Sequence, residues 1–344
     1  MKILFFRLGA IGDTLLTTPA VRKARELFPE AEIHYMAGEA AAEILENNKD
    51  INRIIPLKLT KNFLPREFGI FFVMPFLLKE FGGVDYDYFV DFESSYFSAY
   101  VSLFIHADKK IGHKIEQKKR FYLNKLYSTR VNYEDGGRYS ALRHLALVSE
   151  MKPFENPGLQ MTLNVSYVEK CEALQYMEKN GINIRGKKIM LCLSSTWATK
   201  SWPAKYWVEL VNMINSRFRS HKIIIMTGPG DPPALLEELK VMPNVYVLEL
   251  VKLRPLAAIL SCGDILVAND GAVRHMANAL GIKTIGIFGA TSETGWAIAD
   301  SNNVVLKSDV DCRPCHKPAC KKELECLTGV KPEAVIEKIS ELLK

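Results

Sequence analysis

Residues 7–14 (RLGAIGDT) combine two glycines and a carboxylate in a short connection after an apolar run. Strand carboxyl ends in an open α/β sheet face the ligand crevice, and Gly9 and Gly12 would let the backbone approach a ligand closely. The spacing matches neither the dinucleotide fingerprint nor a Walker A loop, so NAD binding and P-loop chemistry are not indicated. Asp13 would lie at a helix start, where it either serves the crevice as an ionised carboxylate or only caps the helix.

Residues 194–203 (SSTWATKSWP) gather hydroxyl side chains and one lysine after another apolar run. The hydroxyls of Ser195, Thr196 and Thr199, exposed backbone amides and the Lys200 ammonium are all groups that bind phosphate oxygens. The motif therefore predicts a diphosphate-binding loop at a strand end. The alternative is a solvated turn with a surface lysine, because hydroxyl-rich loops precede many helices.

Residues 268–275 (ANDGAVRH) run from an apolar strand into a helix. Asp270 would end the strand, Gly271 would permit a tight turn, and the amides from Ala272 onward would point toward an anion. This pattern is typical of phosphate binding. His275 is either a further hydrogen-bond donor to the ligand or an ordinary helix histidine.

Two more loops of this kind, at residues 228–232 and 288–292, follow other apolar runs in the second half of the chain. Parallel strands bring their carboxyl ends to one edge of a sheet, so four such loops would share that edge. One loop of this composition arises easily by chance. Four of them favour a ligand site.

Four of the seven cysteines form a cluster with the spacing C-x2-C-x4-C-x5-C. They are Cys312, Cys315, Cys320 and Cys326. Four thiols in a reducing compartment are suitable ligands for a tetrahedral structural zinc, although the later gaps match no standard zinc module. Reduced packing thiols and a disulfide remain the alternatives.

Residues 108–130 hold eight Lys/Arg against two acids, interleaved with Phe121, Tyr122 and Tyr127. Apolar stretches at 69–78 and 96–105 precede this segment. The combination indicates a basic, apolar edge that meets a phosphorylated, lipid-anchored ligand at a membrane. A base-stacking surface would use the same residue types, but the alternating β/α pattern makes nucleic acid an improbable ligand. A solvated basic face is the remaining alternative.

Short β-rich apolar runs alternate with helical periodicity along the chain, which predicts βα units and parallel sheets in an α/β fold. In the first half, strands are expected at 2–6, 32–36, 53–56 and 86–91, and helices at 13–27 and 40–46. In the second half, strands are expected at 188–193, 222–227, 245–248, 264–268 and 283–288, and helices at 204–216, 233–239, 255–261 and 272–280.

The length of 344 residues corresponds to about two domains. An Asn-Pro-Gly stretch at 156–158 places the boundary near residue 165, so that the domains are expected at 1–165 and 166–344. A last helix from Pro332 to about Leu343 carries one apolar stripe, for which the first domain is one candidate packing surface.

The composition excludes several classes of protein. At 48% hydrophobic and 24% charged residues, the chain has enough apolar mass for sizeable cores and too much for disorder. The strongly apolar stretch 69–78 is too short to span a bilayer, and no secretory signal is recognised, so a cytoplasmic protein is expected. The net charge of +6 favours an anionic ligand or membrane surface.

The motifs together carry a family resemblance. The stretches MKILFFRLGAIGDTLLTTPAVRKARELFPEAEIHYMAGE, WATKSWPAKYWVEL, NDGAVRHMANALGIKTIGIFGATSE and CRPC resemble the ADP-heptose-dependent lipopolysaccharide heptosyltransferases. The resemblance implies a GT-B fold, in which two Rossmann-like doubly wound domains face each other across a cleft. It also implies that the donor binds mainly to the second domain and the acceptor to the first, with inversion at the sugar carbon and no obligatory metal.

The resemblance assigns roles by motif. Asp13 matches the general base, Asp270 matches the acid at the nucleotide-sugar end, and Lys200 would stabilise the leaving diphosphate. The other donor-side positions are Ser195, Thr196, Thr199, Gly271, Ala272 and His275, and the acceptor-side positions are Arg7, Gly9 and Gly12. Many family members have a hydroxyl residue after the aspartate where this chain has Gly271, so backbone amides must contribute more here.

The expected function is therefore inverting transfer of heptose from ADP-heptose to the lipopolysaccharide inner core. The expected partners are the ADP-heptose donor and a lipid-anchored core acceptor at the inner membrane, where the enzyme would be peripheral on the cytoplasmic face. No cofactor is expected for catalysis, and a structural zinc at the four cysteines stays one of the alternatives given above. The alternatives are a related GT-B transferase with another nucleotide sugar, and a nucleotide-sugar-binding module without turnover.

Overall fold

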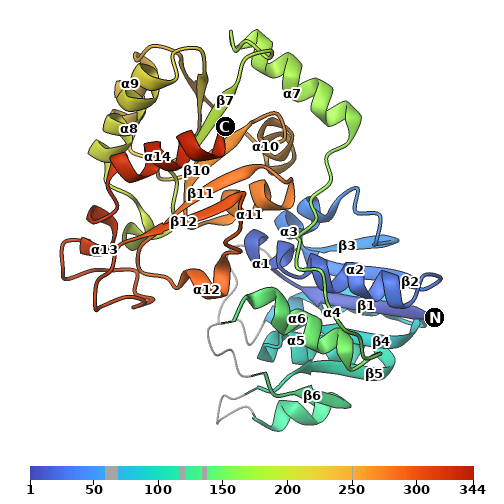
Figure 1. The fold of residues 1–344 in the computed structure, drawn as a ribbon. Coiled ribbons are helices and arrows are strands. Elements are labelled where there is room, and N and C mark those ends of the chain that lie inside the picture. Colours follow the sequence, from blue (N-terminus) through green and yellow to red (C-terminus); the bar gives the residue numbers. More distant parts are fainter. Residues whose placement is uncertain (59–68, 116–120, 134–137, 250) are drawn as a thin grey trace. The chain divides into compact units, whose positions relative to one another are not determined.

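The computed structural model describes residues 1–58, 69–115, 121–133, 138–249 and 251–344 of the chain (Figure 1). These residues form two compact units, Met1–Asn164 and Val165–Lys344. Each unit contains one six-stranded sheet in which every paired strand is parallel. Within the described ranges, no helix is long and apolar enough to cross a bilayer.

The first sheet has the strand order β3-β2-β1-β4-β5-β6. Its strands are β1 (Lys2–Arg7), β2 (Glu32–Gly38), β3 (Arg53–Leu57), β4 (Asp85–Asp91), β5 (His106–His113) and β6 (Thr129–Val131). The chain winds outward from β1 to β3, returns beside β1 with β4, and then winds the other way. This is the Rossmann order, and its direction reverses between β1 and β4.

Helices cover both faces of this sheet, which explains why the four residues between Lys2 and Arg7 are fully buried. The helical segments are α1 (Ile11–Leu15), α2 (Thr18–Leu27), α3 (Glu39–Leu45), α4 (Gly69–Phe81), α5 (Tyr96–Val101), η1 (Ser102–Phe104), η2 (Phe121–Leu126) and α6 (Ser140–Ser149). One helix was expected at 13–27, but the structure has two. The Thr17 and Thr18 hydroxyls donate to the carbonyls of Thr14 and Leu15, which ends α1, and Pro19 lies in the first turn of α2.

The second sheet has the order β12-β11-β10-β7-β8-β9, which is the same topology counted from β7. Its strands are β7 (Lys188–Cys192), β8 (Lys222–Met226), β9 (Val245–Leu248), β10 (Ile265–Asn269), β11 (Lys283–Phe288) and β12 (Asn303–Lys307). The winding direction reverses between β7 and β10. Both units are therefore Rossmann-like, and the predicted α/β fold class of two doubly wound domains is confirmed.

The helices expected in the second unit are all present, together with further helical segments. They are α7 (Tyr167–Lys179), η3 (Ala198–Lys200), α8 (Ala204–Arg217), α9 (Pro233–Lys240), α10 (Leu253–Leu260), α11 (Ala272–Ala279), α12 (Glu293–Trp296), α13 (Glu325–Thr328) and α14 (Pro332–Leu342). The first helix of the unit, α7, begins with a capping box in which Ser166 and Glu169 bond reciprocally. Arg254 of α10 then pairs with Glu169 at 2.7 Å, which docks α7 on α10.

The sequence left open the surface on which the last helix packs. The apolar stripe of α14, formed by Val335, Ile336, Ile339 and Leu342, belongs to the core cluster of the second unit. This stripe contacts α8, β11 and β12, which lie beside α14 in Figure 1. The last helix thus contributes to the core of the second unit.

Candidate functional site

A charged cluster occupies the reversal point of the first sheet. Arg7 ends β1, and Glu93 follows β4, the strand on the other side of the reversal. The Arg7 guanidinium lies 3.1 Å from the Asp13 carboxylate and 3.4 Å from that of Glu93, and it also donates to the Phe92 carbonyl at 2.8 Å. Ligands of open α/β sheets bind at this kind of position.

Asp13 has two kinds of contact in this cluster. Its carboxylate pairs with Arg7 and also accepts a hydrogen bond from the Ala10 amide at 3.3 Å. The second contact is that of a helix cap, while 26% of the Asp13 side chain stays exposed to solvent. Asp13 is therefore fixed in direction by Arg7 and Ala10 and is still open to a ligand.

The glycines of this motif differ in what they contribute. Gly9 has φ +152°, a conformation that residues with a Cβ rarely adopt. Gly38, at the end of β2, approaches the loop so closely that a Cβ there would lie 2.5 Å from the Leu8 carbonyl oxygen. Gly12 is buried in α1. The connection after β1 is thus shaped by backbone packing, and Gly9 and Gly38 make that packing possible.

A second charged cluster occupies the reversal point of the second sheet. Lys200, in η3 after β7, lies 2.8 Å from the carboxylate of Asp270, which follows β10. The same carboxylate oxygen accepts a hydrogen bond from the Thr291 hydroxyl at 2.7 Å, and Arg274 lies 3.7 Å from its other oxygen. Residues 70 positions apart in sequence are thereby joined in one site.

The electrostatics of this cluster favour an anionic ligand. Burial alone would raise the pKa of Asp270, but the nearby Arg274 and Lys200 charges hold that pKa below its usual range. Asp270 is therefore ionised, and the two cations leave the cluster with one net positive charge. Burial, together with the Arg274 charge, lowers the pKa of His275 to about 3, so the imidazole is neutral.

The loop that carries Lys200 is tied to the strands around it. The Asn269 side chain accepts a hydrogen bond from the Trp202 amide at 3.1 Å and donates to the Leu193 carbonyl at 2.6 Å. The Ser194 hydroxyl donates to Asp231, in the loop after β8, at 2.8 Å. The Lys200 ammonium also lies 5.2 Å from the centre of the Trp197 ring. These contacts fix the direction of Lys200.

The chain matches a known protein family over most of its length. The model of glycosyltransferase family 9 (heptosyltransferase) matches residues 76–325. The chain belongs to this family. Over its full length it is 23% identical to lipopolysaccharide heptosyltransferase 1 of Pseudomonas aeruginosa, of which it covers 98%. The chain is therefore a glycosyltransferase, as predicted from its motifs.

Solved structures match the fold. A family 9 glycosyl transferase from Veillonella parvula has a TM-score of 0.83 at 19% identity, across 99% of this chain and 97% of that one. An E. coli heptosyltransferase with ADP-2-deoxy-2-fluoro heptose has a TM-score of 0.72 at 19% identity, across 99% of both chains. At this identity the structural matches establish the shared fold alone.

The other predicted donor-side residues of this heptosyltransferase-family chain differ in where they lie. Thr196 is exposed and Ser195 is partly exposed, with its hydroxyl donating to the Trp197 carbonyl at 3.1 Å. Thr199 is buried, and its hydroxyl donates to the Lys317 carbonyl at 2.6 Å. The structure thus places the Thr199 hydroxyl within the protein interior, where it supports the loop.

The turn before α11 also differs from the sequence expectation. Gly271 has φ −172°, which is extended backbone that any residue adopts, so no tight turn requires glycine there. Gly271 caps the helix and Ala272 begins it, both partly exposed. His275 is buried against Arg274, so its side chain lies inside the unit.

Sequence reasoning missed three residues of the two clusters. Glu93 and Thr291 lie just after strand ends, whereas Arg274 lies in the first turn of α11. Each of the three contacts a predicted site residue. Thr291 lies in a loop that the sequence did single out. Glu93 carried no signal beyond its position two residues after Asp91, the last residue of β4.

The four clustered cysteines were expected to bind zinc, to pack as thiols or to form a disulfide. All four are free thiols. Burial raises the pKa of Cys326, and the neighbouring Cys312, Cys320 and Cys315 raise it further. In the part of the chain that the structure describes, however, no group of three or more His, Cys, Asp or Glu side chains is arranged to hold a metal ion.

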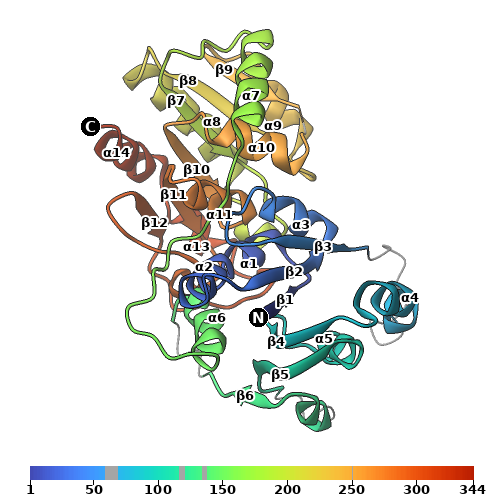
Figure 2. The same cartoon turned by 90° about the vertical axis from the view of Figure 1, so that its right-hand side faces the viewer.

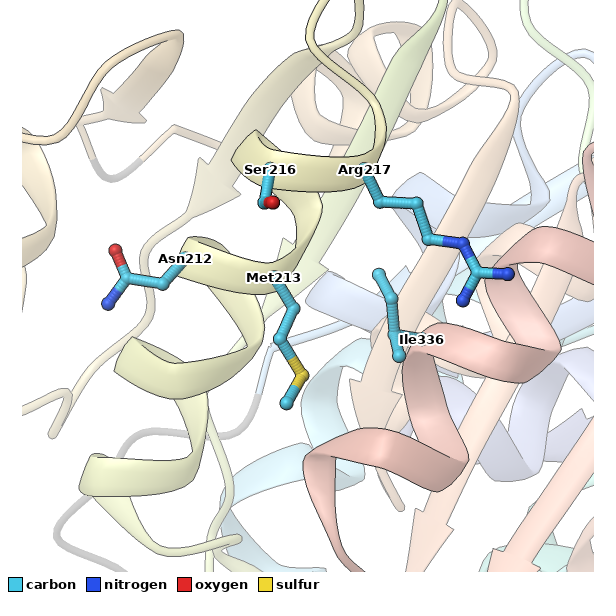
Figure 3. Close-up of a pocket in the computed structure, with 5 residues that line it drawn as sticks. All are labelled: Asn212, Met213, Ser216, Arg217 and Ile336. Atoms are coloured by element: carbon cyan, nitrogen blue, oxygen red, sulfur yellow. The ribbon is translucent and has the colours of Figure 1, made fainter.

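A surface hollow of about 420 Å³ lies between α8 and α14, lined by Asn212, Met213, Ser216, Arg217 and Ile336 (Figure 3). Because α8 runs from the carboxyl edge of the sheet back to its amino edge, its last turn lies at the edge opposite to Lys200. The hollow is therefore separate from the charged cluster of the second unit.

Metal analysis and thiol titration test the state of the cysteine cluster. We expect protein purified without chelator to carry no stoichiometric metal, with the exposed Cys320 reacting first with an alkylating reagent and the buried Cys326 last. The opposite result would be about one zinc per chain, with all four thiols protected from alkylation until the zinc is removed. That result would show that the thiolates bind metal.

Proposed function

We propose that this glycosyltransferase transfers heptose from ADP-heptose to the lipopolysaccharide inner core with inversion at the sugar carbon. The observation that carries the proposal is the pair of charged clusters, one acidic and partly exposed at the first reversal point, one cationic at the second. The Pseudomonas aeruginosa relative is a lipopolysaccharide heptosyltransferase, and the E. coli structure contains an ADP-heptose analogue. The relative supports the choice of acceptor, and the ligand of the E. coli structure supports the choice of donor.

The second unit supplies the donor side in this proposal. A nucleotide diphosphate would be bound by the Lys200 ammonium and by the amides at the start of α11. When the sugar leaves, negative charge develops on the diphosphate, and Lys200 and Arg274 stabilise it. Lys200 exchanges part of its contact with Asp270 for phosphate, while the Thr291 hydroxyl keeps Asp270 satisfied. Because these cations offset part of the charge on the leaving group, we propose that transfer needs no metal.

The first unit supplies the acceptor side. Asp13 would take the proton from the attacking hydroxyl of the acceptor, since a hydroxyl is a weak nucleophile at neutral pH. Arg7 holds the Asp13 carboxylate in a fixed direction, and Glu93 holds Arg7. At Gly9 no atom of the described residues lies within 4 Å of where a Cβ would be, which leaves room beside this loop. Inversion follows if the attack comes from the face opposite to the diphosphate.

A donor screen tests this proposal. Purified protein is assayed for transfer and for binding with ADP-heptose, UDP-sugars and GDP-sugars. We expect transfer with ADP-heptose, and we expect Lys200→Ala to weaken ADP binding by about 10- to 100-fold, because a charge-assisted contact contributes about 1.5–3 kcal/mol. Preferred use of a UDP- or GDP-sugar would favour the related transferase, and binding without turnover would favour a binding module.

Asp13→Asn tests the catalytic base. Asparagine keeps the size of the side chain and its capping oxygen, so we expect an unchanged melting temperature and unchanged ADP affinity. Turnover should fall by about 10²–10⁴-fold, which is the usual contribution of a general base. Transfer rate, ADP affinity and melting temperature are measured on one preparation. Transfer at the parent rate would show that Asp13 is only a cap.

We also propose that the enzyme works at an anionic membrane surface, to which the first unit binds. Phe71, Phe72 and Leu78 of α4 are 64%, 68% and 55% exposed, and Leu103 in η1 and Tyr122 in η2 are also exposed. Figure 2 shows α4 beside α5, and α4 also contacts η1. Large exposed apolar patches of this kind mark interaction sites.

The charges near this patch favour lipid as its partner. Lys79, Lys109, Lys114 and Lys125 are exposed on the same unit, whereas Arg130 donates to the His113 carbonyl inside it. The predicted basic segment 108–130 is thus only partly a surface feature, and its residues 116–120 lie outside the described residues. Exposed lysines on the unit that carries the exposed apolar side chains match an anionic headgroup layer.

The variant Phe71→Ser/Phe72→Ser tests membrane binding by cosedimentation with phosphatidylglycerol vesicles. We expect binding to fall at least tenfold, since each phenylalanine loses about 1.5–3 kcal/mol of burial in the lipid interface. Tyr167→Ser, at an exposed aromatic of the second unit, is the matched control and should bind as the parent does. Unchanged vesicle binding would contradict the proposal. So would a parent protein that is a dimer and a variant that becomes a monomer, because the patch would then be an interface between two copies of the chain.

A further inference from the structure

The segment that carries the four cysteines, residues 308–326 and here called the cysteine segment, is bonded to the loops of the cationic cluster. The amides of Cys315 and His316 donate to the Ala290 carbonyl at 3.0 and 2.9 Å. The Lys317 carbonyl accepts from the Thr199 hydroxyl at 2.6 Å. The cysteine segment therefore contacts both the loop after β7 and the loop after β11.

Arg313 makes the densest set of these contacts. Its Nε donates to the Gly289 carbonyl at 2.6 Å, and its Nη2 donates to the Thr291 carbonyl at 3.1 Å. Nη2 also pairs with Glu293 at 3.2 Å, and only 8% of the Arg313 side chain is exposed. Because Glu293 neutralises its charge and the backbone carbonyls occupy its donors, Arg313 is placed to hold the loop rather than to bind a ligand.

The loop held by Arg313 leads directly to the cationic cluster. Thr291, whose carbonyl Arg313 binds, donates its own hydroxyl to Asp270 at 2.7 Å, and Asp270 binds Lys200. The neighbouring Ala290 amide donates to the Thr199 carbonyl at 3.2 Å, one residue before Lys200. Gly289 lies so close that a Cβ there would be 2.5 Å from the Thr199 carbonyl oxygen. Two short routes thus join Arg313 to Lys200.

We propose that the cysteine segment is a clamp on the donor side of the site and that Arg313 is its positioning residue. Arg313 binds the carbonyls of Gly289 and Thr291 and so keeps the Thr291 hydroxyl hydrogen-bonded to Asp270. Asp270 in turn binds Lys200, so its position determines that of the ammonium group. The proposal rests on the proposed donor role of the second unit. In this proposal the function of the cysteine segment is to hold the loops that bind the donor.

Arginine is suited to this task in a way that lysine is not. Its planar guanidinium presents five N–H donors in a rigid fork, so it can bind two carbonyls and one carboxylate at once. A lysine would keep the charge and the pair with Glu293 but would lose the fixed geometry. Arg313→Lys is therefore the variant that separates positioning from charge, and Arg313→Met removes both.

The experiment is a double-mutant cycle between Arg313 and Thr291, with ADP affinity measured by calorimetry. We expect Arg313→Met and Thr291→Val each to weaken ADP binding about tenfold, and the double variant to be little weaker than either, because both break one chain of contacts. Arg313→Lys should fall between the parent and Arg313→Met. Arg217→Met, at an exposed arginine of α8, should bind ADP as the parent does.

Melting temperature and steady-state kinetics separate positioning from folding. A clamp on the donor loops predicts a higher KM for the donor in Arg313→Lys, whose melting temperature should stay close to that of the parent. Additive effects in the cycle, or a lower melting temperature with unchanged ADP affinity, would overturn the proposal. If Arg313→Met does not fold, the cycle with Arg313→Lys decides.

The same data distinguish failure of the clamp from failure of the proposed function. If the parent protein binds no ADP, the donor assignment is wrong, and the cycle is repeated with the nucleotide that binds in the donor screen. If the parent binds ADP and the Arg313 variants bind it equally well, the donor assignment stands and the clamp is wrong.

Discussion

The topology of a doubly wound sheet determines where a ligand site can form in each unit of this chain. At the point where the winding reverses, the connections after two neighbouring strands leave in opposite directions, and the strand ends stay open. Both units place a charged cluster at this point. In the first, Arg7 after β1 meets Glu93 after β4, and in the second, Lys200 after β7 meets Asp270 after β10.

The buried carboxylate of Asp270 sets the charge balance of the second cluster. A buried charge is costly unless it is paired and hydrogen-bonded, and Lys200, Arg274 and Thr291 together meet that requirement. The same arrangement keeps two cations in place before any ligand arrives, so little reorganisation is needed when an anion binds. Asp270 is therefore the residue that organises the cluster, and its carboxylate holds the Lys200 ammonium in position.

Apolar runs made the central strands predictable, because strands buried on both faces are nearly continuous in hydrophobic residues. The strand β5 was missed since its first half (HADKK) is largely exposed and polar, and it was interpreted as part of a basic segment instead. Lys200 and Asp270 were each recognised from their loops, but their contact was not, because pairing across 70 residues depends on strand order. Arg313 was missed for a related reason, since its carbonyl partners have no signature in the sequence.

The helix-cap role of Asp13 and its proposed catalytic role are compatible on physical grounds. A cap needs one carboxylate oxygen as an acceptor, and the Ala10 amide and Arg7 both contact the same oxygen, Oδ2. The other oxygen of a carboxylate has acceptor sites of its own, so it can receive a proton while the first stays bound. Arg7 is in turn fixed by Glu93. Burial raises the pKa of Glu93, and the Arg7 charge partly offsets this effect. In the proposed reaction, a base anchored by one oxygen would keep its direction, as in-line attack on the sugar carbon requires.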